Sequence, residues 1–251
     1  MDTAPRVALI TGAGRGIGRA TAIMLGEQGT AVGINYVRDV HAAEQTAAAV
    51  ERAGGRAVLL QGDVADEAAV IALFDALEAV CGPIDALVNN AGIVAPPLPL
   101  AQMDTARLKR MFDVNILGAY ICAREAARRM SLDRGGRGGA IVNVSSAASR
   151  LGSPNEYVDY AGSKGAIDTM TIGLAKELAP RGVRVNAVRP GLIETDIHAS
   201  GGQPQRAAVL GAQTPMGRPG QAEEVARAIV WLLSAGASYV NGALLDVSGG
   251  R

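Results

Sequence analysis

The chain has 251 residues, a length that suits one large α/β domain (residues 1–251) with a sizeable hydrophobic core. Its 24 basic and 24 acidic residues cancel, and the sequence pI is about 6.7, so no basic surface for nucleic acid or an anionic membrane is expected. Aromatic residues make up only 3% of the chain, which further disfavours a base-stacking surface for nucleic acid.

The cysteines and the N-terminal residues predict the compartment. Cys81 and Cys122 form no CxxC pair and have no histidine close in sequence, so neither a disulfide framework nor a metal site is expected. The chain enters a strand at once, without the basic and apolar regions of a signal peptide, and no apolar run approaches the ~18 residues of a membrane span. These features predict a soluble, cytoplasmic protein whose partners are small molecules or further copies of itself.

The first expected strand, at residues 6–11, leads into a glycine-rich loop and then an alanine-rich helix to about residue 28. The loop glycines that define the spacing are Gly12, Gly16 and Gly18. The N-terminus of a helix that follows a strand presents free N–H groups and a positive dipole end to a pyrophosphate. The pattern predicts a nucleotide-binding loop. A glycine-rich turn without a ligand is the alternative, since the spacing differs from G-x-G-x-x-G.

The second expected strand, at residues 31–36, ends about 20 residues beyond the loop, where dinucleotide folds place an acidic residue on the ribose hydroxyls of NAD. Here that position is Tyr36, followed by Arg38. Arg15 and Arg38 are suited to pair with a 2′-phosphate through charge-assisted hydrogen bonds. NADP is therefore favoured, and NAD remains an alternative because Asp39 lies close by and both arginines fit ordinary surface charges.

The chain continues to alternate between helical and strand patterns. Helices are expected at residues 41–53, 67–80, 104–130, 166–178 and 221–233, and strands at 57–61, 85–89, 140–144, 182–188 and 243–247. Seven strands alternating with helices predict a single doubly wound Rossmann domain. Its seven-stranded parallel sheet carries helices on both faces and binds ligands at the carboxyl ends of the strands.

Residues 146–164 join the fifth expected strand to the helix that follows it, and they carry the main candidate for chemistry. Tyr160 and Lys164 are four residues apart, so on a helix they share a face, where an ammonium lowers a phenol pKa by favouring the phenolate. Tyr157 has Ala161 four residues on and lacks such a partner. The three polar groups Ser146, Tyr160 and Lys164 are therefore expected to meet in one cleft.

Together, the loop T-G-x-x-x-G-x-G at residues 11–18 and this serine, tyrosine and lysine resemble the short-chain dehydrogenase/reductase family, over essentially the whole chain. The resemblance implies that Ser146, Tyr160 and Lys164 are the catalytic residues. The gap from Ser146 to Tyr160 is one residue longer than is usual in the family, so Ser145 stays a candidate for the same role.

The family resemblance also implies a reaction, hydride transfer between a nicotinamide and a carbonyl or alcohol carbon, with no metal. Tyr160 would protonate the nascent alkoxide, Ser146 would bind the carbonyl oxygen, and Lys164 would hold the nicotinamide ribose and lower the Tyr160 pKa. Asn115, in the sequence D-V-N, matches the family's helix asparagine, which holds a water that leads from the lysine to solvent.

Other positions match cofactor contacts of the family. Asp63 would touch the adenine, although it also suits a helix N-cap, for which Asp66 is better placed. Thr195 would touch the nicotinamide carboxamide, and Pro190 and Gly191 break a strand so that the backbone approaches a ligand. The full expected cofactor site is Gly12, Arg15, Gly16, Ile17, Gly18, Tyr36, Arg38, Asp63, Val64, Asn90, Ala91, Gly92, Tyr160, Lys164, Pro190, Gly191, Ile193 and Thr195.

Residues 194–220 show no firm periodicity and are rich in glycine and proline, which is typical of a mobile substrate lid. The helices at 104–130 and 157–179 are unusually apolar for exposed helices, and family members pair such helices, so a homotetramer is expected, with a dimer next.

The substrate is open from the sequence. A 3-oxoacyl-[acyl-carrier-protein] reductase is one alternative, because the arginines between Arg124 and Arg137, with Arg181, are suited to an acidic carrier protein, although solvated surface charge explains them equally. A sugar (glucose-type) 1-dehydrogenase or a general ketone reductase is another. A catalytically silent dinucleotide sensor is the alternative from a different class. It is disfavoured because a sensor needs no proton donor at the nicotinamide.

Overall fold

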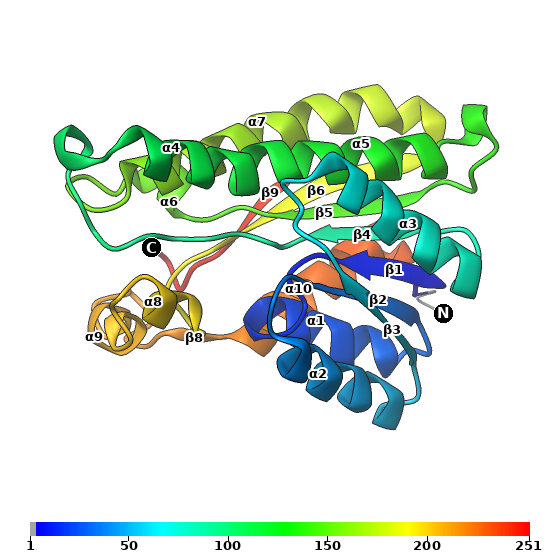
Figure 1. Cartoon of the computed structure of the whole chain (residues 1–251), viewed down its shortest axis with the longest axis horizontal. Coiled ribbons are helices and arrows are strands. Elements are labelled where there is room, and N and C mark those ends of the chain that lie inside the picture. Colours follow the sequence, from blue (N-terminus) through cyan, green and yellow to red (C-terminus); the bar gives the residue numbers. More distant parts are fainter. Residues whose placement is uncertain (1–3) are drawn as a thin grey trace.

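The computed structural model describes residues 4–251, and its centre is a seven-stranded parallel sheet (Figure 1). The strands follow the order β3-β2-β1-β4-β5-β6-β9, and every neighbouring pair is parallel. The winding direction reverses between β1 and β4, which is the switch point beside which doubly wound folds bind ligands. The predicted fold class, a Rossmann sheet with helices on both faces, is confirmed.

The strands of the main sheet are β1 (Val7–Ile10), β2 (Ala31–Tyr36), β3 (Arg56–Gln61), β4 (Ala86–Asn89), β5 (Gly139–Val144), β6 (Val183–Pro190) and β9 (Leu244–Val247). The longer helices are α1 (Gly16–Gly26), α2 (Val40–Arg52), α3 (Glu67–Cys81), α4 (Thr105–Phe112), α5 (Ala119–Met130), α7 (Val158–Leu178) and α10 (Ala222–Leu233). No helix formed by residues 4–251 combines the length and apolar character needed to cross a membrane.

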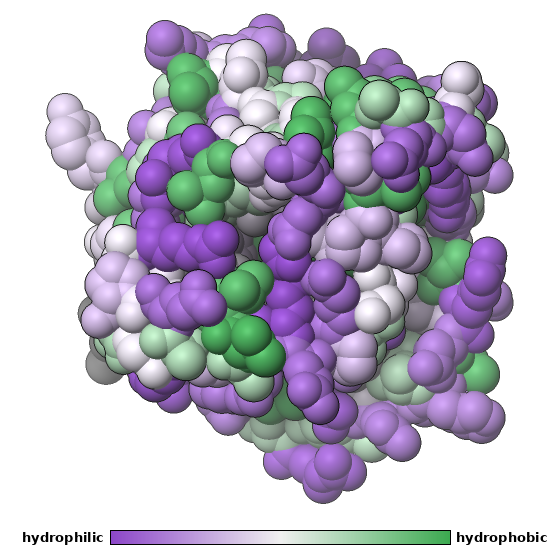
Figure 2. All heavy atoms as spheres, turned by 90° about the vertical axis from the view of Figure 1, so that its left-hand side faces the viewer, coloured by the Kyte–Doolittle hydropathy of each residue, from purple (hydrophilic) through white to green (hydrophobic). Residues whose placement is uncertain are grey.

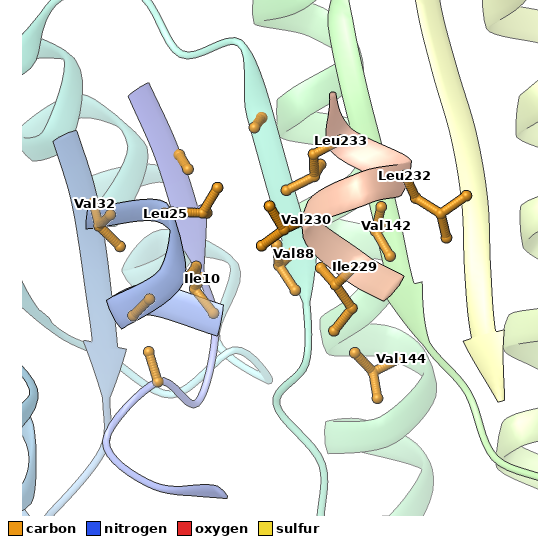
Figure 3. Packing of buried hydrophobic residues seen from close by; sticks show 14 of the residues in the cluster. Ile10, Leu25, Val32, Val88, Val142, Val144, Ile229, Val230, Leu232 and Leu233 are labelled. Atoms are coloured by element: carbon orange, nitrogen blue, oxygen red, sulfur yellow. The ribbon is translucent and has the colours of Figure 1, made fainter. Parts of the chain in front are cut away.

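Each face of the sheet has its own hydrophobic core. Successive side chains of a strand point to opposite faces, so Ile10 of β1 joins the cluster under α1, α2 and α10, and Leu9 joins the cluster under α3, α5 and α7. Figure 3 shows the first cluster, where Ile229 of α10 lies over Val88 and Val142 of the central strands. Burial on both faces explains why these strands are continuous apolar runs rather than alternating ones.

The helix expected over residues 104–130 is divided by a π-helical segment, η2 (Asp113–Gly118), between α4 and α5. Asn115 lies within this segment and is buried. A Cβ atom at Gly118 would lie 2.7 Å from Val64 Cγ2, so the glycine allows the helix to lie close to the loop that follows β3. The apolar periodicity continues through the segment, which is why the sequence predicts one uninterrupted helix. Such wide turns occur often at functional sites.

The segment at residues 194–220 contains more regular structure than its sequence predicts. It holds α8 (Ile197–Ser200) and α9 (Arg206–Gly211), and its ends are joined where β7 (Ile193–Glu194) pairs in parallel with β8 (Gly220–Gln221). Arg218 forms a bidentate pair with Glu224 of α10, at 2.8 and 2.7 Å. The segment is therefore a folded flap that is fixed at both ends.

Candidate active site

A cleft of about 670 Å³ opens at the carboxyl ends of the strands and is bounded on one side by the segment that carries α8 and α9. Figure 2 looks onto this side of the molecule, where hydrophilic residues are interspersed with small groups of hydrophobic ones. All the residues expected from the sequence to bind cofactor or to act in catalysis line the cleft, except Gly18 and Asn115. Residues that are more than a hundred positions apart in the sequence thus lie together at the carboxyl ends of the parallel strands.

The glycine loop brings the start of α1 to the cleft. Arg15 is the N-cap residue of α1, and its side chain makes no capping hydrogen bond to the N–H groups of the first turn. Gly12 and Gly16 have φ angles of 64° and 54°, in the region that favours glycine. The uncapped N–H groups and the positive dipole end of α1 therefore face the cleft, an arrangement that fits the pyrophosphate of a dinucleotide.

Gly18 lies behind the loop and serves packing. A Cβ atom at Gly18 would lie 2.6 Å from Asn90 Nδ2 and 2.7 Å from the carbonyl oxygen of Gly12. The same Asn90 amide donates to the carbonyls of Thr11 and Gly12, at 2.9 and 3.0 Å. Asn90 thus fixes the glycine loop through backbone groups, and it also lines the cleft as expected.

The end of β2 carries the groups that bear on the choice between NAD and NADP. Tyr36, Arg38 and Arg15 all line the cleft, and Arg15 also donates to Ser200 Oγ of α8 at 3.1 Å. The carboxylate of Asp39 caps the N-terminus of α2, so its charge is engaged with that helix. Arg15 and Arg38 are therefore two cationic side chains at this end of the cleft, and the last residue of β2 is Tyr36 rather than an acidic residue.

Asp63, the expected adenine contact, lines the cleft and is held by two donors. It accepts a hydrogen bond from the backbone N–H of Ala65 at 3.0 Å and from Arg110 Nη2 at 2.9 Å. Burial acts to raise the pKa of Asp63, but these hydrogen bonds and the charges of Arg110 and Arg38 outweigh it, and the pKa is lowered. Asp66, rather than Asp63, caps α3, as predicted.

The structure distinguishes the two neighbouring serines after β5. Ser145 is 2% exposed, and its hydroxyl donates to the backbone carbonyl of Lys164 at 3.1 Å. The Ser146 side chain lies in the cleft, where it acts to lower the pKa of the Tyr160 phenol, and its hydroxyl accepts the backbone N–H of Ala148 at 3.1 Å. The longer gap between serine and tyrosine is thus accommodated by the turn that contains α6 (Ala148–Leu151), and Ser146 is the serine beside Tyr160.

The side chains of Lys164 and Asn115 both lie close to Gly92. Lys164 Nζ donates to the carbonyl of Val144 at 2.8 Å, and a Cβ atom at Gly92 would lie 3.5 Å from both Lys164 Nζ and Asn115 Oδ1. The Asn115 side chain accepts from the backbone N–H of Ile93 and donates to its carbonyl, at 2.8 and 3.0 Å. Asn115 is therefore adjacent to the lysine but positions the chain after β4 rather than lining the cleft.

Burial shifts the pKa values of Tyr160 and Lys164 in opposite directions. It raises the pKa of Tyr160, which the hydrogen bond from Ser146 opposes. It lowers the pKa of Lys164 to about 8, which the charge of Asp168 opposes. From the sequence, Lys164 is expected to lower the Tyr160 pKa. In this structure burial decides the direction, because Nζ lies 5.6 Å from the centroid of the Tyr160 ring and is bonded to Val144.

The sequence did not single out several residues that form the wall of the cleft. Tyr157, which lacks a lysine partner, nevertheless lines the cleft, and its hydroxyl is 3.0 Å from Gln203 Oε1. The Cζ atom of Arg206, in α9, lies 4.9 Å from the centroid of the Tyr157 ring. The same guanidinium forms a bidentate pair with Glu156, at 3.0 and 2.5 Å. Arg110, which binds Asp63, also lines the cleft and is not marked by any sequence pattern. These approaches join residues about 50 positions apart, and no local pattern reports them.

The family model described as enoyl-(acyl carrier protein) reductase matches residues 12–251 of the chain. An uncharacterized oxidoreductase of Escherichia coli strain K12, YgfF, is 54% identical over 98% of this chain and 99% of its own length. A cis-4-hydroxycyclohexanecarboxylate dehydrogenase of Sinomonas cyclohexanicum is 42% identical over 98% of this chain and 96% of its own length. The similarity thus covers nearly the full length of both relatives.

Two solved structures share the fold and contain a nicotinamide dinucleotide. A short-chain dehydrogenase of Burkholderia cenocepacia in complex with NADP is 31% identical, with a TM-score of 0.88 over 98% of this chain and 97% of the other. A 3-ketoacyl-(acyl-carrier-protein) reductase of Brucella melitensis complexed with NADH is 34% identical, with a TM-score of 0.90 over 98% of both chains. The chain belongs to the short-chain dehydrogenase/reductase family, and it is an oxidoreductase that acts on alcohol or carbonyl substrates with a nicotinamide cofactor.

Proposed function

We propose that the protein is an NADP(H)-dependent dehydrogenase or reductase of small carbonyl and alcohol substrates, with Ser146, Tyr160 and Lys164 at the reacting oxygen. One observation carries the proposal: these three side chains line the same cleft as the open N-terminus of α1. A site for a dinucleotide phosphate and a site for proton transfer are thus parts of one cavity.

The bound nicotinamide supplies or accepts the hydride. In the reductive direction Tyr160 gives its proton to the substrate oxygen, and in the oxidative direction it takes that proton back. Ser146, which lines the cleft with Tyr160, hydrogen-bonds the same oxygen. Lys164, which lines the same cleft, would hold the nicotinamide ribose. Asn115 keeps the backbone at Ile93 beside Lys164.

NADP rather than NAD is proposed as the preferred cofactor because Arg15 and Arg38 line the cleft near Tyr36. The proposed substrates are compact cyclic alcohols and ketones, a class suggested by the relative named for cis-4-hydroxycyclohexanecarboxylate. An acyl carrier protein is less well supported. Two of its candidate arginines are engaged on the chain itself, since Arg124 pairs with Glu67, and Arg181 pairs with Asp133.

A panel of substrates tests this function directly. Cyclic ketones, 3-oxoacyl thioesters, aldoses and cis-4-hydroxycyclohexanecarboxylate are assayed with both phosphorylated and unphosphorylated nicotinamide cofactors, by absorbance at the reduced nicotinamide band. We expect the highest kcat/KM for a cyclic ketone with NADPH or for the matching alcohol with NADP⁺. Tight NADPH binding without turnover of any compound would instead support the sensor alternative.

The choice between the two serines gives a second measurable outcome. Ser146→Ala is expected to lower kcat at least tenfold, because it removes the hydroxyl proposed to hydrogen-bond the reacting oxygen in the cleft that Tyr160 also lines. Ser145→Ala is the matched comparison, because its hydroxyl faces the Lys164 carbonyl. A larger loss of kcat in Ser145→Ala than in Ser146→Ala would move the catalytic role by one residue.

A homotetramer is proposed for the assembly because two separate helical surfaces expose large hydrophobic side chains. Leu117 and Tyr120, around the start of α5, are 48% and 44% exposed, and Trp231 of α10 and the nearby Tyr239 are exposed as well. Two self-complementary patches generate a closed tetramer through two two-fold axes. Light scattering should give about four times the chain mass of 25.6 kDa. Leu117→Glu should reduce this to a dimer, and a wild-type monomer at micromolar concentration would contradict the proposal.

We further propose that residues 1–251 form one domain in which the segment at 194–220 covers the substrate. Support for the second point comes from Ile197 and Arg206, which line the cleft from α8 and α9.

A cytoplasmic location is proposed because Cys81 and Cys122 are both free thiols, which suits a reducing compartment.

A further inference from the structure

The first turn of α7 carries a buried ion pair directly beside Tyr160. The Asp159 side chain has no exposed area, and that of Arg107 in α4 is 13% exposed. Arg107 Nε donates to Asp159 Oδ2 at 2.8 Å, and Nη2 donates to Oδ1 at 3.4 Å. The pair therefore joins α4 to the helix that bears Tyr160, and Figure 1 shows these two helices side by side.

Both partners also bind backbone groups around the cleft. Asp159 Oδ1 accepts the backbone N–H of Tyr160 at 2.9 Å, one of the N–H groups that the start of a helix leaves free. Arg107 Nη1 donates to the carbonyl of Pro96 at 2.6 Å. Val94, two residues before Pro96, lines the cleft. One guanidinium and one carboxylate thus fix the backbone of Tyr160 and the opposite loop relative to each other.

Stability alone does not account for a charged pair at this place. Removing two charges from water is costly, and apolar residues of similar volume commonly stabilise a fold equally well. What the fork of an arginine adds is a defined geometry, because its two parallel hydrogen bonds fix direction as well as distance. Defined geometry matters most beside a reacting group, where a displacement of about 1 Å can cost a hundredfold in rate.

We propose that Asp159 and Arg107 are positioning residues for Tyr160, which set where the phenol oxygen stands relative to the substrate oxygen. The inference rests on the proposed function of Tyr160. Neither residue lines the cleft, so both act through the backbone of α7 and the loop at Pro96 rather than by touching the substrate.

The double variant Arg107→Leu with Asp159→Leu tests the inference, because it removes both charges together and leaves no single buried charge behind. We expect a folded protein whose melting temperature stays within a few degrees of wild type and whose NADPH dissociation constant stays within twofold. The expected kcat falls at least tenfold, with KM for the carbonyl substrate changed less than threefold. A folded double variant with kcat within twofold of wild type would overturn the inference.

Asp159→Asn keeps the test decisive if the double variant does not fold, since its amide oxygen still accepts the Tyr160 N–H. Its kcat should fall at least threefold at unchanged KM, and a wild-type kcat counts against the inference. The matched control is Arg129→Leu with Glu78→Leu, a pair at 2.7 Å whose side chains are 20% and 25% exposed and which does not line the cleft. This control should retain wild-type kcat.

The outcomes also separate the inference from the function on which it rests. If Tyr160→Phe retains full turnover, the proposed function fails. If Tyr160→Phe is inactive while the Arg107 and Asp159 double variant is fully active, only the positioning inference fails. Hydrogen exchange of the amide at Tyr160 gives a readout that needs no substrate, and it should accelerate in the double variant but not in the Arg129 and Glu78 control.

Discussion

Tyr160→Phe should lower kcat by roughly 10²–10⁴, the usual contribution of general acid catalysis, and leave the NADPH dissociation constant within about twofold. The change removes the only atom of Tyr160 that can transfer a proton and preserves the ring, which packs 5.6 Å from Lys164 Nζ. Steady-state kinetics with the best substrate of the panel, together with NADPH fluorescence titration, measures both quantities.

Tyr157→Phe is the matched comparison for this experiment, since Tyr157 lines the same cleft on the preceding turn. Its hydroxyl contacts Gln203 rather than Ser146, so its loss of kcat should be at least tenfold smaller than that of Tyr160→Phe. If Tyr160→Phe keeps a tenth of the wild-type kcat, or if Tyr157→Phe loses more, Tyr160 is not the proton donor.

The double change Arg15→Ala with Arg38→Ala should raise KM for NADPH roughly ten- to a hundredfold and leave KM for NADH almost unchanged. A 2′-phosphate brings nearly two negative charges to the end of β2. Two exposed charge-assisted contacts of about 1 kcal/mol each account for that range, because each 1.4 kcal/mol is tenfold in affinity. Initial rates over a series of concentrations of each cofactor provide the measurement.

Tyr36→Asp should shift the preference further toward NADH, because a carboxylate repels the 2′-phosphate and accepts the ribose hydroxyls of NAD. As a control, Arg19→Ala removes a charge from α1, the helix that Arg15 precedes, at a position that does not line the cleft, and should change neither KM. A wild-type enzyme with higher kcat/KM for NADH than for NADPH would show that the preference for NADP is wrong.

The sequence predicts the fold closely where local patterns and long-range packing agree. The apolar runs around Ile10, Val88 and Val142 predict buried strands, and the alternation with helices predicts that the strands run parallel, which the sheet confirms. The same logic places the glycine loop, Ser146 and Tyr160 at one edge, because the carboxyl ends of parallel strands share that edge. Geometry of this kind follows from connectivity, so it can be predicted without coordinates.

Contacts between side chains from distant elements could not be predicted in the same way. Arg110 reaches Asp63 across 47 positions, and Arg206 reaches Glu156 across 50, through packing that no periodicity encodes. The direction of the Tyr160 pKa shift was also beyond the sequence. It depends on how far the phenol is buried and on where the Lys164 ammonium finds its acceptor, and both are tertiary properties.

The π-helical segment at 113–118 limits how far this protein can be stabilised by engineering. A π turn holds one more residue than an α turn of similar height, with less favourable hydrogen bonding, so deleting one residue there would regularise the helix. That deletion would also rotate Asn115 away from Ile93 and release the backbone beside Lys164. Thermostability selected at this segment should therefore come at the expense of turnover, and a useful stabilising library would leave these six positions unchanged.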